Sequence, residues 1–159
     1  MGSDQPGETY YYSSLIVPIF GIAQPSLGPE NDHLHAYVYY EHAAKKGGNN
    51  VTSLVWKEVQ RQCLNTGSKC KELVFVFDDC SGQNKNKMVI RLLTLLVARE
   101  YTKKAMAIFL MRGHANDDCD HMFNLMKKHY CKSNVHLPAE LYKHIGRNKN
   151  VVFVPVDID

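Results

Sequence analysis

The chain has 159 residues, of which 45% are hydrophobic and 22% are charged, and its formal net charge is +3. This length fits one domain that buries roughly two thirds of its unfolded surface, and the composition excludes disordered, collagen-like and coiled-coil classes. A charge this small does not by itself indicate nucleic-acid binding, so that case depends on where the charges lie.

The sequence predicts a soluble intracellular protein. No apolar run approaches the roughly 20 residues that span a bilayer, and residues 1–14 lack the basic and apolar regions of a secretory signal. The cysteines are odd in number and form no C-x-x-C pair: Cys63, Cys70, Cys80, Cys119 and Cys131. This pattern argues against a disulfide framework and a standard zinc finger, and it favours a reducing compartment.

The first part of the chain reads as two strands and a helix. Residues 10–22 are rich in aromatic and β-branched residues and end before Pro25, and residues 34–40 are a second such run, so we expect an antiparallel pair. After the break at residues 47–50, apolar residues recur at helical spacing as far as Gly67.

Strands and helices alternate in the rest of the chain. The apolar run 73–77 predicts a strand covered on both faces. Residues 84–101 are apolar on nearly every side, which predicts a helix packed deep against a sheet, and residues 105–111 follow as a buried strand. The remaining expected elements are helices at 117–130 and 138–144 and a short strand at 151–154. This order predicts a single α/β domain with a mixed sheet and helices on both faces.

Ligand sites in such open sheets lie at the carboxyl ends of strands, which directs attention to Asp78 and His114. Asp78 ends a strand just before a polar turn and a basic helix start, where a carboxylate can bind a hard cation such as Mg²⁺. In the alternative interpretation, Asp78 and Asp79 end the strand and cap the next helix. His114 could orient a phosphate, accept a proton or bind metal, or it could be only a hydrogen-bonding residue.

Two further carboxylates are candidates. Asp120, Asn124 and Lys127 form a polar stripe along the predicted helix 117–130, so we expect this face to look toward the strand ends. Glu41 ends the second strand and could complete a metal site, or it could be an exposed partner of a neighbouring lysine.

These segments carry a family resemblance that covers nearly the whole chain. The strings are DDCSGQNKNK and RGHANDDCDHMFNLMKK, preceded by EHAAKKGGNNVTSLV and DQPGETYYYSSLIVPIFGI. They resemble an uncharacterised transposase-derived family of eukaryotic mobile elements with a ribonuclease H-like fold. The expected architecture is a three-layer α/β/α domain in which two leading antiparallel strands precede parallel strands that alternate with helices.

The resemblance implies a DDE-type core for metal-dependent DNA cleavage and strand transfer, with two Mg²⁺ or Mn²⁺ ions. Asp78 would be the acid on the central strand and Asp120 the acid on the later helix, with His114 and Asn116 at the margin of the site. The first acid of the triad is expected upstream of this sequence, and Glu41 is the best candidate within it.

We expect DNA as the partner, no membrane and no small-molecule cofactor, with a homo-oligomer left open and a nuclear location. The residues expected to contact nucleic acid are Lys45, Lys46, Gln83, Asn84, Lys85, Lys87, Asn116, Asn124 and Lys127.

Three alternatives stay open. The first is an inactive, domesticated or truncated transposase domain that binds nucleic acid or protein without cleaving it. The second is a zinc module built from the local set His114, Cys119, His121, His129 and Cys131. The third is a small-molecule enzyme, for which the chain offers no GxGxxG, P-loop or GxSxG motif.

Overall fold

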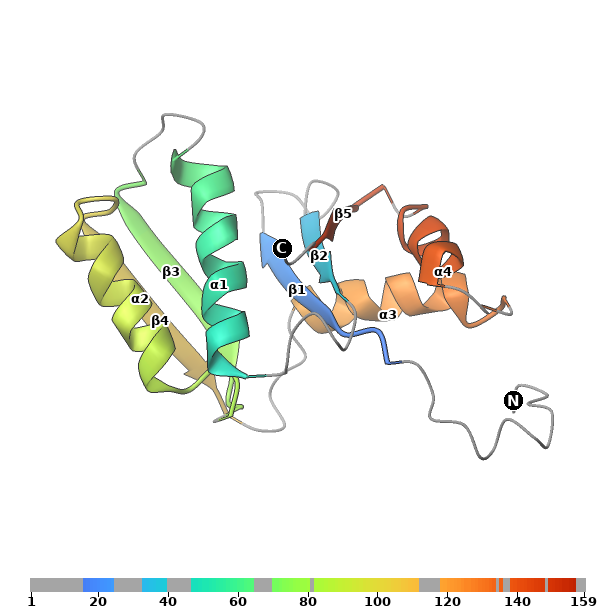
Figure 1. Ribbon diagram of the computed structural model, residues 1–159, viewed down its shortest axis with the longest axis horizontal. Helices are drawn as coiled ribbons and strands as arrows, with labels where there is room; N and C mark the ends of the chain where they lie inside the picture. Colours follow the sequence, from blue (N-terminus) through green and yellow to red (C-terminus); the bar gives the residue numbers. More distant parts are fainter. Residues whose placement is uncertain are drawn as a thin grey trace. The chain divides into compact units, whose positions relative to one another are not determined.

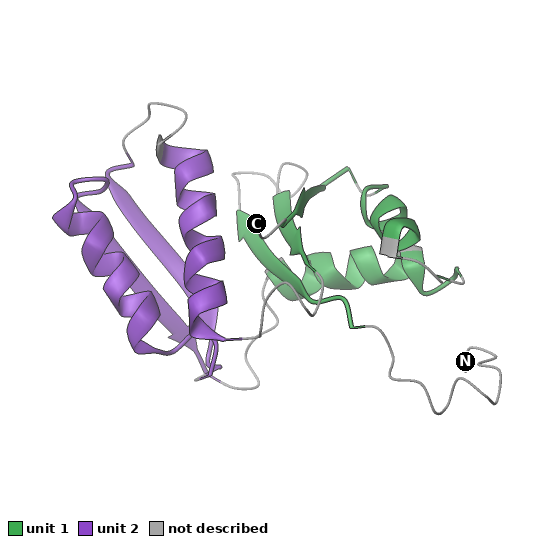
Figure 2. Ribbon diagram, in the orientation of Figure 1, with its two compact units in different colours: residues 1–44, 118–159 green, residues 45–117 purple. Residues whose placement is uncertain are grey.

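The computed structural model describes two compact units of the chain (Figure 2). Unit 1 comprises Met1–Ala44 and Asp118–Asp159, and unit 2 comprises Lys45–Asp117. Unit 1 is thus built from both ends of the chain. The described residues are 16–24, 33–39, 47–64, 70–80, 82–111, 118–133, 135, 138–147 and 149–156. The prediction of a single domain stays a prediction.

Unit 1 contains a mixed three-stranded sheet in the order β1-β2-β5 (Figure 1). Strand β1 (Ile19–Gln24) pairs antiparallel with β2 (His33–Val38), and β5 (Val151–Pro155) pairs parallel with β2 on its other edge. The predicted antiparallel pair and the predicted last strand are therefore confirmed. The predicted first strand overlaps β1 only from Ile19, and residues 10–15 lie outside the described residues.

Two helices pack with this sheet, α3 (Asp118–Tyr130) and α4 (Pro138–Ile145), close to their predicted bounds. α3 approaches β1 so closely that a Cβ added to Gly21 would lie 2.6 Å from Cζ of Phe123. The core of the unit is a cluster of buried residues from all these layers: Leu34, Ala36, Val38, Met122, Met126, Ile145 and Val151.

Unit 2 is a β-α-β unit preceded by a helix. Helix α1 (Gly48–Val59) continues into a π-helical turn, η3 (Gln60–Leu64). Strand β3 (Glu72–Asp78) then leads through α2 (Lys87–Ala98) to β4 (Lys104–Leu110), which pairs parallel with β3. The predicted order of elements is confirmed. However, the described strands form two sheets, one mixed and one parallel, where the sequence predicted one mixed sheet.

The prediction that residues 73–77 are covered on both faces is wrong. Val74 and Val76 are 54% and 53% exposed, whereas Phe77 on the other face is buried and stacks on Phe109. The predicted buried strand that follows is also covered on one face only, since Met106 is exposed. A two-stranded sheet that packs a helix on one face leaves its second face open.

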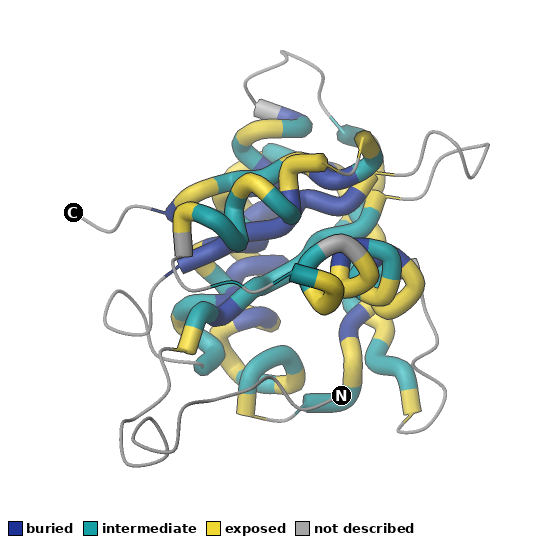
Figure 3. Tube along the Cα trace, turned by 90° about the vertical axis from the view of Figure 1, so that its right-hand side faces the viewer, coloured by how far each residue is buried: buried dark blue, intermediate teal, exposed yellow. Residues whose placement is uncertain are grey.

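Helix α2 also departs from its prediction. Its buried residues lie along one side: Val89, Leu92, Leu93 and Leu96. Large apolar residues on its other sides are exposed: Met88, Ile90, Leu95 and Val97. The helix is therefore not packed on every side. Along the helices in general, buried and exposed residues alternate (Figure 3).

The cysteine pattern argued against disulfides, and this expectation is wrong for one pair. Cys63 and Cys70 form a disulfide with their Cα atoms 5.9 Å apart, while Cys80, Cys119 and Cys131 are not part of a disulfide. The chain reverses between η3 and β3 and so brings together two cysteines that match no short spacing motif. Among the described residues, no helix is long and apolar enough to cross a membrane.

Candidate functional site

Asp78 is the last residue of β3, and its exposed side chain lies on the open face of that strand. Side chains alternate along a strand, so Asp78 shares this face with Val74 and Val76. No hydrogen bond or ion pair links the Asp78 carboxylate to any residue that the structure describes. Both carboxylate oxygens are therefore free to bind a cation.

The turn after β3 is held by its own backbone. The carbonyl of Cys80 accepts N–H bonds from Gln83, Asn84 and Lys85 at 3.1, 2.7 and 3.1 Å. The side-chain Nδ2 of Asn84 also donates to the main-chain carbonyl of Asp78 at 3.2 Å. These bonds tie the end of β3 to the start of α2.

Asn86 caps α2. Its Oδ1 accepts the backbone N–H groups of Met88 and Val89 at 2.8 and 3.2 Å, and its Nδ2 donates to the carbonyl of Gln83 at 2.7 Å. The interpretation in which Asp78 and Asp79 cap this helix is therefore wrong, because Asn86 fills that role. The Asp78 carboxylate is therefore available for a role other than helix capping.

Asp79 and Lys85 neutralise each other next to the free carboxylate. Lys85 Nζ lies 3.0 Å from Asp79 Oδ1 and 5.9 Å from the centroid of the Phe109 ring. Lys87 lies in the first turn of α2 and is exposed. Asp79 thus has a cationic partner, whereas Asp78 and Lys87 remain open to a ligand.

The start of α1 lies against the cap of α2. A Cβ added to Gly48 would fall 2.5 to 2.8 Å from side-chain atoms of Asn86, so a larger residue there would displace the capping side chain. The starts of both helices therefore lie at the carboxyl end of β3 (Figure 1). No side chain caps α1 at Gly47. Because helix N-termini carry partial positive charge, this end of unit 2 favours an anion such as a phosphate.

Asn84 contributes one more unused oxygen. Its Oδ1 is buried and has no hydrogen-bond partner, although its Nδ2 is bonded to the carbonyl of Asp78. A buried acceptor without a partner is costly. Amide and carboxylate oxygens are ligands of hard divalent cations, so Asn84 and Asp78 together suit such an ion.

Asp120 lies in unit 1, in the first turn of α3. Asp120, Asn124 and Lys127 are all exposed, while Met122 and Met126 on the opposite side are buried. The exposure of the predicted polar stripe is therefore confirmed, whereas its orientation toward the strand ends stays a prediction. Because Asp78 belongs to unit 2, the meeting of the two carboxylates at one site stays a prediction.

Several predicted residues lie outside the described ranges: Glu41, Lys45, Lys46, His114 and Asn116. Within those ranges, no group of three or more histidine, cysteine or acidic side chains could hold a metal ion. In the zinc alternative Cys119 would be a ligand, but its thiol instead donates to the carbonyl of Gly21 at 3.5 Å.

The comparison with protein families gives a match over most of the chain. A family model described as a domain of unknown function, DUF7869, matches residues 27–154. The chain belongs to the DUF7869 family. No curated protein and no solved structure matches it. Asp78 and Asp120 both fall within the DUF7869 match, whereas β1 lies before it.

Two residues that organise the site in this DUF7869 chain, Asn86 and Gly48, were not predicted from the sequence. Asn86 was available as a signal, because asparagine is among the preferred N-cap residues and directly precedes α2. Gly48 gave no such signal, because its role depends on a contact with a residue 38 positions away in the chain.

Proposed function

We propose that this chain is a ribonuclease H-like DDE-type core for metal-dependent cleavage and strand transfer of DNA. The observation that supports the proposal best is the free Asp78 carboxylate at the carboxyl end of β3, next to the starts of α1 and α2. The strings quoted above support the same fold and chemistry by resemblance. A nuclear location belongs to the proposal, since DNA is the substrate.

Asp78, Asp120 and Glu41 would hold the Mg²⁺ or Mn²⁺ ions, with Asn84 Oδ1 as a further oxygen. When bound, such a metal pair activates the attacking hydroxyl and stabilises the leaving oxygen of a phosphodiester. Mg²⁺ takes one or two carboxylates from a protein and completes its shell with water and phosphate oxygens, so the free Asp78 carboxylate suits it.

The remaining groups of the site would position the DNA backbone. The uncapped start of α1 and the exposed Lys87 supply positive charge beside Asp78. Asn86 holds the start of α2 in place through its three hydrogen bonds, and its side chain lies against Gly48 at the start of α1. Asn124 and Lys127 would add contacts from α3, and His114 would orient a phosphate or accept a proton.

The chain provides a matched pair of variants for testing this proposal. Asp78→Asn and Asp79→Asn each remove one charge from the same turn, but only Asp79 is paired with a lysine. With Mn²⁺ and supercoiled DNA, we expect Asp78→Asn to lower the nicking rate at least about 100-fold, as is typical when a group that stabilises the transition state is lost. Asp79→Asn should stay within about threefold of the parent. Equal losses in both variants, or no nicking by the parent chain, would contradict the proposal.

A second candidate is a nucleic-acid binding module that does not cleave. It is favoured by the lack, within the described residues, of a group of three metal-binding side chains. In this case both variants would bind DNA as the parent does. Lys87→Gln would reduce the slope of log K against log salt by about one, with no metal-dependent nicking in any of the proteins.

A further inference from the structure

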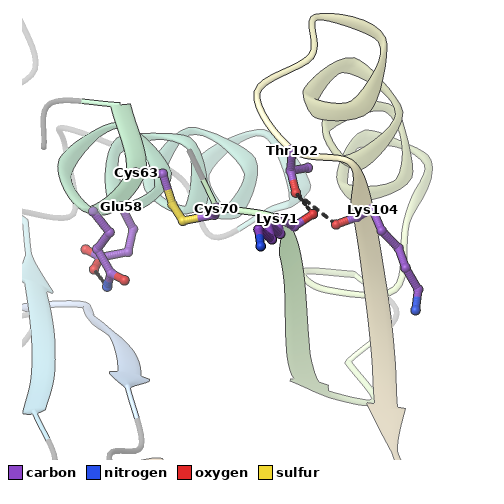
Figure 4. The surroundings of a disulfide bond; sticks show 7 residues. Glu58, Cys63, Cys70, Lys71, Thr102 and Lys104 are labelled. Atoms are coloured by element: carbon purple, nitrogen blue, oxygen red, sulfur yellow. Dashed lines mark hydrogen bonds between the residues drawn. A yellow bond between two sulfur atoms is a disulfide. The ribbon is translucent and has the colours of Figure 1, made fainter. Parts of the chain in front are cut away.

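The disulfide joins the end of the first helix of unit 2 to the segment just before β3. Cys63 lies in the π-helical turn η3, and Cys70 lies two residues before β3 (Figure 4). Their Cα separation of 5.9 Å is within the usual range for disulfides. All five cysteines of the chain are described, and only these two are paired. The pairing is therefore specific.

Both ends of the bridge are anchored independently. On the helix side, the buried Glu58 carboxylate accepts hydrogen bonds from Arg61 at 2.6 Å and from Gln62. On the strand side, the carbonyl of Lys71 accepts bonds from the buried Thr102 hydroxyl at 3.1 Å and from the Lys103 amide at 3.0 Å. The bridge therefore links the end of α1 to the amino-terminal end of the β3–β4 sheet.

The two sulfur atoms differ in their access to solvent. Cys63 is buried, with only 4% of its surface exposed, whereas Cys70 is partly exposed. Thiol–disulfide exchange requires that the reagent reach the sulfur that it attacks. An external thiol or disulfide can therefore react at Cys70 more readily than at Cys63.

We propose that Cys63 and Cys70 are a reversible redox pair that exchanges with low-molecular-weight thiols and disulfides of the glutathione class through Cys70. In reduction, a glutathione thiolate attacks Cys70 Sγ, and the Cys63 thiolate leaves and takes up a proton. A second glutathione then attacks the mixed disulfide, which frees Cys70 as a thiol and yields glutathione disulfide. Oxidation follows the same steps in reverse, so two electrons and two protons pass between the cysteine pair and glutathione.

The redox state of the pair would control how firmly α1 is attached to the sheet. After reduction the Glu58 and Lys71 contacts remain, but only the peptide chain between the two cysteines joins them covalently. Asp78 is at the opposite end of β3, about 20 Å away at the usual rise per residue of a strand. The pair therefore acts on the amino-terminal end of the sheet and does not depend on the proposed function.

The test uses the whole chain in glutathione buffers that range from reducing to oxidising, with trapped thiols counted by mass spectrometry. We expect one two-electron transition that forms the Cys63–Cys70 disulfide, with no protein disulfide among Cys80, Cys119 and Cys131. Hydrogen exchange of η3 and the start of β3 should be faster in the reduced protein, with the turn at residues 82–86 unchanged. A pair that stays reduced in every buffer, or exchange that is identical in both states, would overturn the proposal.

Single-cysteine variants test the entry point. In Cys63→Ala, glutathione disulfide should modify Cys70 about ten times faster than it modifies Cys63 in Cys70→Ala. Cys131→Ala is the control, because Cys131 is exposed and free, and it should leave the redox transition unchanged. Faster modification of Cys63 would contradict entry through Cys70. If either variant loses its native circular dichroism spectrum, the same rates are measured in the parent chain by peptide mapping of the first mixed disulfide.

Discussion

Strand β2 is more buried than β3, although its sequence is less hydrophobic. β2 reads HLHAYV and contains two histidines, yet its last five residues are all buried. β3 reads ELVFVFD and is more apolar, yet its burial alternates and only Phe77 is buried. Among the described strands, β2 has a paired strand on each edge, whereas β3 pairs with β4 alone. Burial therefore follows the neighbours of a strand and not its hydrophobicity alone.

The same difference separates the roles of the two units. Unit 1 surrounds β2 with a packed cluster drawn from α3, α4 and β5. Unit 2 leaves one face of its sheet open, and the free carboxylate of Asp78 lies at the end of that face. The unit with the less covered sheet thus carries the unpaired carboxylate of the candidate site.

The same substitution at one position in each strand tests this difference in burial. Val38 is 2% exposed in β2 and Val76 is 53% exposed in β3. Val38→Ala should lower the free energy of unfolding by about 2 to 3 kcal/mol, because it removes buried methyl groups and leaves a cavity. Val76→Ala should lower it by less than about 1 kcal/mol. Urea unfolding followed by circular dichroism measures both, and equal losses would show that the β3 face is covered.

Two glycines provide a smaller contrast between the units. A Cβ at Gly21 would overlap the Phe123 ring, whereas a Cβ at Gly82 would meet no atom within 4 Å. Gly21→Ala should therefore destabilise unit 1 by about 1 to 2 kcal/mol through overpacking. Gly82→Ala should be close to neutral. Thermal unfolding of both variants is the measurement, and a neutral Gly21→Ala would mean that α3 does not lie against β1.

The smallest expected effect is a pH dependence in unit 1. Burial, with a lesser contribution from Cys131, raises the pKa of Tyr130 above its ordinary value. The folded state then holds the phenol proton more tightly than the unfolded state does. Stability should therefore be constant below about pH 10 and fall as the pH rises through the raised pKa. Urea unfolding between pH 8 and pH 11 would show this fall, and Tyr130→Phe should reduce it.

The elements themselves could be predicted from the sequence. Helical spacing located α3 and α4 to within about one residue, and the polar stripe through Asp120 is exposed as expected. Aromatic and β-branched runs indicated the antiparallel pair β1–β2. Each of these features depends on residues that are close together in the chain, which is the range over which periodicity carries information.

Features that depend on distant residues could not be predicted in the same way. The apolar run 73–77 indicates a strand but does not reveal how many neighbours that strand has. The Cys63–Cys70 bridge depends on a chain reversal that no spacing motif encodes. At the candidate site, Asp78 was identified from its position at a strand end, whereas the contact of Gly48 with Asn86 required the packing of two helices.

Binding of Mn²⁺ tests the central claim most directly, which is that the free Asp78 carboxylate is a cation ligand. Electron paramagnetic resonance titrations would compare the parent chain with Asp78→Asn, Asp120→Asn and Asp79→Asn. We expect the first two variants to weaken Mn²⁺ binding at least about tenfold and Asp79→Asn to bind as the parent does, because Lys85 already neutralises Asp79. A parent chain that binds no Mn²⁺, or an Asp79→Asn variant as impaired as Asp78→Asn, would contradict the account.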